Sequence, residues 1–238
     1  MGRGLRSELL KLRTTRSTWG VLAGAVAIAV VAFVAPGENA IAELSEPFHE
    51  QQSTFFIGFL LRVILLVLGV RAVTDEWRYG TLTPSLLALP RRGAFLVLKT
   101  AATAGAGLAI TALATGAMVL TAAAYAQVND VTLGEVSFHS LAGMALSGGL
   151  WAAIGVGLGA MLKSQLLATV VGIVWLMGVD DMLRERLGDL AVYLPGQAGL
   201  ALVTAPGAAG LTRAIVTLLA YALVMLVAGV MLTNRRDV

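Results

Sequence analysis

Residues 54–73 read TFFIGFLLRVILLVLGVRAV, a run in which Arg62 is the only charge before Arg71. About 20 apolar residues in a helix match the thickness of the hydrocarbon core of a bilayer. This run therefore predicts a membrane-spanning helix. Arg62 falls near its middle, where a charge costs about 2.5–3.5 kcal/mol even on the lower insertion scales, so its side chain should face a cavity or a partner.

The whole chain has the same character. Its 238 residues are 58% hydrophobic and 13% charged, with a mean hydropathy of +0.84. A soluble domain carries about 25% charged residues, so these values exclude a soluble globular domain and also disorder. A net charge of +3 would suggest a nucleic-acid partner only for a soluble chain, and we expect none. The absence of Cys excludes disulfides and thiolate chemistry.

Six apolar segments predict an all-α membrane protein with six transmembrane helices in a single domain over residues 1–238. The fifth segment is short for a span, or tilted. The predicted spans are 19–36, 54–73, 99–127, 139–162, 165–179 and 211–233.

The charges between these segments predict the orientation. Thirteen basic residues and four acidic ones fall on the side of the N-terminus, against three basic and ten acidic residues on the opposite side. Because basic residues are concentrated in cytoplasmic connections, both termini should be cytoplasmic. We expect a multi-pass protein of the plasma or inner cell membrane, in contact with membrane lipids.

Two further segments are not simple spans. The leader, residues 1–18, places Leu5, Leu9 and Leu12 on one helical face and basic residues on the other, which predicts an interfacial helix at the cytoplasmic surface. The alternative is a basic leader without defined structure. Residues 180–210 begin with charges and continue as an apolar run too short to span comfortably, which predicts an external re-entrant or interfacial helix pair. The alternative there is an ordinary external loop.

The cytoplasmic connection 74–93 is longer than a turn between two spans needs to be. Thr83 and Pro84 form a good N-cap and first helical position, and Leu89 precedes Pro90, which disfavours continuation of a helix. The sequence therefore predicts a short cytoplasmic helix from Pro84 to Leu89. Its leucines need a surface to cover them, and another protein is the natural candidate.

At this point the chain resembles the ABC-2 type permeases, the membrane subunits of a class of ATP-driven exporters. The resemblance lies in the leader, in the first cytoplasmic loop and in the segment before the last span. It is carried by ELLKLR at 8–13 with Arg16, Ser17 and Trp19; by Glu76, GTL at 80–82, LLA at 86–88, Pro90, Arg91, Arg92 and Lys99; and by YLP at 193–195 with Ala198 and Leu202.

The resemblance implies that the leader forms an elbow helix and that the first-loop helix is a coupling helix seated in a groove of the ATPase. It also implies a second permease subunit, identical or related, and an ABC ATP-binding subunit that binds ATP and Mg²⁺, so that no cofactor is expected in this chain. We assign coupling to Glu76, Arg78, Gly80, Thr81, Pro84, Leu86, Leu87, Pro90, Arg91 and Arg92. Among them, Glu76 and the arginines are expected to make polar contacts with the ATPase.

No enzymatic role is expected of the chain itself. The sequence holds no Gly-x4-Gly-Lys-Ser/Thr phosphate loop and no zinc-ligand or nucleophile motif. The alternative to an ATP-driven permease is an ATP-independent secondary transporter or channel-like protein. That class would need intramembrane carboxylates for ion coupling, whereas every Asp and Glu here lies at or outside the predicted span ends.

Two kinds of residue inside the spans have open interpretations. Arg62 either contacts a polar or anionic substrate in the translocation path, or pairs with Asp180, Asp181 or Glu50. The small-residue pairs Gly20/Gly24 and Gly155/Gly159 allow close helix approach, either within one subunit or, less often, between subunits.

Overall fold

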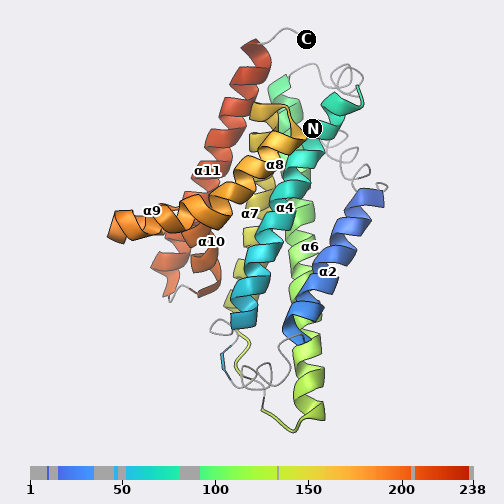
Figure 1. Cartoon of the computed structure of the whole chain (residues 1–238), viewed down its shortest axis with the longest axis vertical. Coiled ribbons are helices and arrows are strands. Elements are labelled where there is room, and N and C mark those ends of the chain that lie inside the picture. Colours follow the sequence, from blue (N-terminus) through green and yellow to red (C-terminus); the bar gives the residue numbers. More distant parts are fainter. Residues whose placement is uncertain are drawn as a thin grey trace.

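A computed structural model describes residues 10, 16–34, 46–47, 52–80, 92–132, 134–204 and 207–235. All the regular structure in these ranges is helical, which confirms the prediction of an all-α protein there (Figure 1). The helices are α2 (Arg16–Val34), α4 (Gln52–Arg78), α6 (Arg92–Val128), α7 (Phe138–Leu162), α8 (Gln165–Val174), the π-helix η1 (Trp175–Val179), α9 (Asp180–Leu187), the 3-10 helix η2 (Gly188–Tyr193), α10 (Pro195–Thr204) and α11 (Gly207–Arg235).

Five helical stretches among the described residues are long and apolar enough to cross a membrane. The chain is therefore a multi-pass membrane protein. These stretches are Thr54–Arg78, Gly93–Val128, Phe138–Leu162, Gln165–Tyr193 and Ala208–Leu232, and α2 adds the shorter apolar stretch Thr18–Val31.

The helices around the predicted loop 74–93 are longer than the apolar segments. Helix α4 continues to Arg78, and α6 already begins at Arg92. Hydropathy ends a span at the first charges, but a helix is held by hydrogen bonds between backbone groups and can continue beyond them. Here Arg71 pairs with Asp75 one turn later, at 3.8 Å between Nε and Oδ2, and the Thr74 hydroxyl donates to the Val70 carbonyl.

Helix α7 is the centre of the bundle and packs against α4, α6 and α11. A Cβ added at Gly155 would lie 2.2 Å from the Leu66 carbonyl oxygen, and one at Gly159 would lie 2.9 Å from the Val70 carbonyl oxygen. This small-residue pair therefore brings α7 against α4 within one subunit. Gly20 and Gly24 on α2 have no such neighbour within 4 Å among the described residues.

Helix α8 does not end where the fifth apolar segment ends. It passes through η1 into the charged helix α9, which projects from the side of the bundle in Figure 1. Helix α10 then returns to pack against α7 and α11. The interfacial leader over residues 1–18 lies outside the described residues except for Leu10 and for residues 16–18 within α2.

One end of the bundle collects basic residues, and we call it the basic end. There α4 ends at Arg78, α6 begins at Arg92, Lys163 caps α7 and α11 ends at Arg235. Figure 1 places these helix ends together at the top of the view, with the connection between α6 and α7 at the opposite end. The described helices thus alternate in direction, as a chain that crosses a bilayer repeatedly must.

Candidate functional site

At the basic end a buried ion pair joins α4 to α6. The Nζ of Lys99 lies 2.6 Å from the Oε1 of Glu76, and the two side chains are 6% and 9% exposed. Lys99 also lies over the ring of Phe95, 5.2 Å from its centroid. The pair lies on the two helices that enter and leave the predicted coupling loop, so it fixes the distance between the ends of that loop.

A left-handed glycine ends α4 at this point. Gly80 has φ +66°, a conformation that favours glycine, and its N–H lies 3.4 Å from the Trp77 carbonyl oxygen. The N–H of Tyr79 donates to the Asp75 carbonyl at 2.9 Å. Gly80, which we assigned to coupling, therefore lets the chain leave α4 and enter the loop.

The remaining predicted coupling residues fall into three groups. Arg78 is exposed at the end of α4, and Arg92 is the first residue of α6. Glu76 is buried. The predicted helix from Pro84 to Leu89 lies outside the described residues, as do Thr81, Pro84, Leu86, Leu87, Pro90 and Arg91.

The burial of Glu76 changes the role that we assign to it. We predicted a polar contact with the ATPase, but its carboxylate is held by Lys99 inside the protein. We now assign to Glu76 the positioning of the loop, and direct contact stays a prediction for Arg78, Arg91 and Arg92. The sequence contained one signal for this pair: opposite charges just inside two consecutive helices on either side of one loop.

Arg62 lies in a second polar cluster, between α4 and α10. Arg62 is 9% exposed. Its Nε donates a hydrogen bond to the Gly58 carbonyl at 3.0 Å, and its NH1 donates one to the Gly196 carbonyl at 2.9 Å. The carboxylate of Asp180, itself 2% exposed, accepts from the N–H of Gly196 at 3.0 Å. Arg62 and Asp180 therefore do not pair directly. Arg62 binds the carbonyl group of Gly196 and Asp180 binds its N–H, so the two side chains together fix the position of Gly196.

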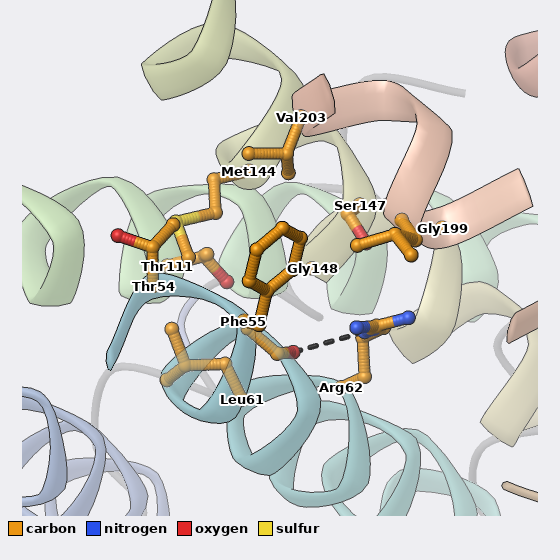
Figure 2. Close-up of a pocket in the computed structure, with 12 residues that line it drawn as sticks. Thr54, Phe55, Leu61, Arg62, Thr111, Met144, Ser147, Gly148, Gly199 and Val203 are labelled. Carbon is orange, nitrogen blue, oxygen red and sulfur yellow. Dashed lines mark hydrogen bonds between the residues drawn. The ribbon is translucent and has the colours of Figure 1, made fainter. Parts of the chain in front are cut away.

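The cavity beside Arg62 is too small for an organic substrate. Figure 2 shows it between Phe55, Met144 and Ser147, with the guanidinium of Arg62 at one side and Gly199 above it. Its volume is about 20 Å³, enough for roughly one water molecule. The contacts support a structural role for Arg62, which fastens α10 to α4, and its place in a translocation path stays a prediction.

Replacing Arg62 by Gln should lower the thermal stability of the protein by the equivalent of about 1.5–3 kcal/mol, the contribution of a hydrogen bond to a charged group. The shorter side chain cannot reach both Gly58 and Gly196. Arg213→Gln, at an exposed position of α11, is the matched control. Thermal melting of the purified variants measures both, and an Arg62→Gln protein that melts with the wild type contradicts the fastening role.

The secondary-transporter alternative depends on where the carboxylates lie, because such a transporter needs them inside the membrane for ion coupling. The sequence placed every carboxylate at or outside the span ends, and the structure buries two of them, Glu76 and Asp180. Both are engaged by protein donors, Lys99 in one case and the N–H of Gly196 in the other. Neither forms part of a group of three or more metal-ligating side chains among the described residues.

The sequence was also compared with known proteins. A family model described as "ABC-2 family transporter protein" matches residues 4–179. The matched range includes α2 to η1, the buried Glu76–Lys99 pair and the whole predicted coupling loop. No curated protein matches the chain.

Proposed function

We propose, since the chain belongs to the ABC-2 family of transporter proteins, that it is the membrane-spanning permease subunit of an ATP-driven exporter. A separate ATP-binding subunit docks on the loop of residues 74–93 and supplies ATP and Mg²⁺. Two permease subunits, identical or related, enclose the translocation path. The chain moves substrate and catalyses no covalent step.

Six spans with both termini cytoplasmic fit this role. The 19 residues of α2 give a helix of about 28 Å at 1.5 Å per residue, close to the thickness of the hydrocarbon core. With the five longer stretches, α2 makes an even number of crossings. The basic end then faces the cytoplasm, as the positive-inside rule requires, and presents the loop to a cytoplasmic ATPase.

The observation that carries the proposal is the buried pair between Glu76 and Lys99. A loop attached to two helices that were free to separate would absorb the motion of a docked partner. Because the pair joins α4 to α6 at the root of the loop, displacement of the loop moves both helices together. Helix α7 packs against both of them, so the motion reaches the centre of the bundle.

Charge reversal in the loop tests the docking. The Arg91→Glu/Arg92→Glu variant should lower co-purification of the ATP-binding subunit by tenfold or more, which corresponds to about 1.4 kcal/mol, because like charges then meet at the contact. The control is Arg184→Glu/Arg186→Glu, which makes the same charge change on α9. Unchanged co-purification of the loop variant would rule out a polar contact at these arginines.

A further inference from the structure

Two buried hydroxyl groups line the cavity beside Arg62. They belong to Thr54 at the start of α4 and to Ser147 inside α7, and these residues are 1% and 4% exposed. Neither hydroxyl has a hydrogen-bond partner among the described residues. A buried hydroxyl that is left unpaired destabilises a protein, so the position of these two groups in one cavity needs an explanation.

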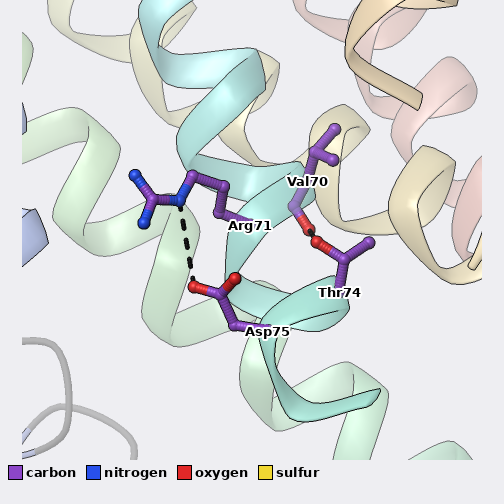
Figure 3. A network of polar contacts seen from close by, with 4 residues as sticks. All are labelled: Val70, Arg71, Thr74 and Asp75. Carbon is purple, nitrogen blue, oxygen red and sulfur yellow. Dashed lines mark hydrogen bonds and ion pairs between the residues drawn. The ribbon is translucent and has the colours of Figure 1, made fainter. Parts of the chain in front are cut away.

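Two other buried hydroxyls of the bundle are satisfied within their own helix. Figure 3 shows this arrangement at Thr74, whose hydroxyl donates to the Val70 carbonyl one turn earlier at 2.9 Å. Thr111, which lines the same cavity as Ser147, donates to the Gly107 carbonyl at 2.9 Å. Ser147 lies inside a helix that offers the same kind of acceptor, but its hydroxyl does not make this bond. It is therefore available to a group in the cavity.

Arg62 supplies a third polar group to the cavity. Its hydrogen bonds to the Gly58 and Gly196 carbonyls use Nε and NH1. Because a guanidinium group has five N–H donors, protons remain for a further acceptor. Figure 2 shows the guanidinium at one side of the cavity and Ser147 at another. The cavity thus combines two hydroxyls with a positively charged donor.

The size and charge of the cavity favour one small neutral molecule. Its volume is about 20 Å³, and a water molecule needs about 10–15 Å³ by this measure. The buried carboxylate of Asp180, which binds the N–H of Gly196, already offsets the charge of Arg62. A water molecule can accept from Arg62 and donate to both hydroxyls, which gives the number of bonds that is typical of buried water.

We propose that one ordered water molecule occupies this cavity and joins Thr54 of α4 and Ser147 of α7 to the guanidinium of Arg62. Arg62 fastens α10 to α4, so the water extends this connection to α7. Three helices are then held at one polar cluster inside the bundle. Neither the site nor its ligand depends on the proposed function.

Thr54→Val tests the water by the sign of its effect, because this substitution keeps the shape of the side chain and removes its hydroxyl. A hydroxyl bound to water contributes a hydrogen bond, so the purified variant should melt about 2–4 °C below the wild type. An unpaired hydroxyl would give the same or a higher melting temperature, and that result overturns the proposal. Thr212→Val, which removes an exposed hydroxyl of α11, is the matched control and should melt with the wild type.

The two hydroxyls should also depend on each other, although they do not bond directly. Ser147→Ala removes one of the groups that hold the water. In that background Thr54→Val should lower the melting temperature by less than half of its effect in the wild type, because groups that share a partner are not additive. Equal shifts in both backgrounds would mean that the hydroxyls bind separate partners, which contradicts a shared water.

Radiolytic labelling detects the water itself. X-ray irradiation produces hydroxyl radicals from water, these oxidise the side chains beside it, and mass spectrometry locates the products. Met144, 2% exposed, lines the cavity, whereas Met118, 0% exposed, belongs to the same apolar core but does not line it. Met144 should be oxidised severalfold more than Met118, and Thr54→Val/Ser147→Ala should remove the difference. Equal oxidation of the two methionines in the wild type overturns the proposal, whether or not the double variant folds.

A halide ion is the alternative occupant of a cavity of this size beside an arginine. Replacing chloride by gluconate in the buffer should leave the melting temperature of the wild type unchanged, because water does not depend on the salt. A lower melting temperature in gluconate, restored by chloride and absent from Thr54→Val/Ser147→Ala, would assign the cavity to an anion and overturn the proposal.

Discussion

Replacing Lys99 by Met should destabilise the permease by about 3–5 kcal/mol, the largest effect that we expect from a single side chain, because the buried Glu76 carboxylate then loses the ammonium group of Lys99. Thermal melting in mild detergent measures the change. Arg71→Gln is the matched control, since Arg71 and Asp75 are 38% and 31% exposed and a pair of this kind contributes about 0–1 kcal/mol.

The double variant Glu76→Leu/Lys99→Met separates stability from coupling. It contains no buried charge at this position, so it should recover most of the stability lost in Lys99→Met. It also lacks the connection between α4 and α6, and stimulation of ATP hydrolysis by the permease should therefore stay low. Normal stimulation in the double variant would show that the pair serves folding alone.

Adding a single methyl group at Gly155 should disrupt the contact between α4 and α7. A Cβ there would lie 2.2 Å from the Leu66 carbonyl oxygen, a backbone atom that cannot rotate away, so the two helices must separate. Overpacking of this kind costs typically about 1–3 kcal/mol, and we expect Gly155→Ala to reach or exceed the upper value. The purified protein should melt at a lower temperature.

Gly116→Ala on α6 is the control for this substitution, because none of the described residues has an atom within 4 Å of a Cβ at that position. Alanine replaces glycine in a helix interior there, which should raise stability by about 0.5–1 kcal/mol. The two substitutions are chemically identical and should act in opposite directions. The same small effect at both positions would contradict the close packing of α4 against α7.

The sequence predicted the parts of this fold that depend on composition and charge. The run of residues 54–73 became α4, and the small-residue pair Gly155/Gly159 became a helix contact within the subunit. Both predictions are correct because the length of an apolar run and the size of a side chain determine the structure at the place where they occur in the sequence. Charge placement likewise located the basic end, where Arg78 and Lys163 are found together.

The sequence could not identify the partners of buried polar groups. We expected Arg62 to contact a carboxylate or a substrate, but it binds the Gly58 and Gly196 carbonyls. Every residue has a backbone carbonyl, so the sequence does not show which of them accepts a hydrogen bond from a buried side chain. The continuation of α8 into α9 was missed because hydropathy falls at Asp180, whose carboxylate is in fact buried against the N–H of Gly196. Burial was also unexpected for Glu76, which we had placed at the surface of the loop.

The most direct test of the central claim is a cross-link between the predicted coupling loop and an ATP-binding subunit. The chain contains no cysteine, so Leu87→Cys introduces a single thiol at which a photoreactive maleimide can be attached. We predict an illumination-dependent adduct between this position and an ABC ATP-binding subunit, and none from Tyr193→Cys, which replaces a half-exposed side chain after α9. Absence of the adduct from Leu87→Cys in membranes that contain both proteins, or an equal adduct from Tyr193→Cys, would contradict coupling through this loop.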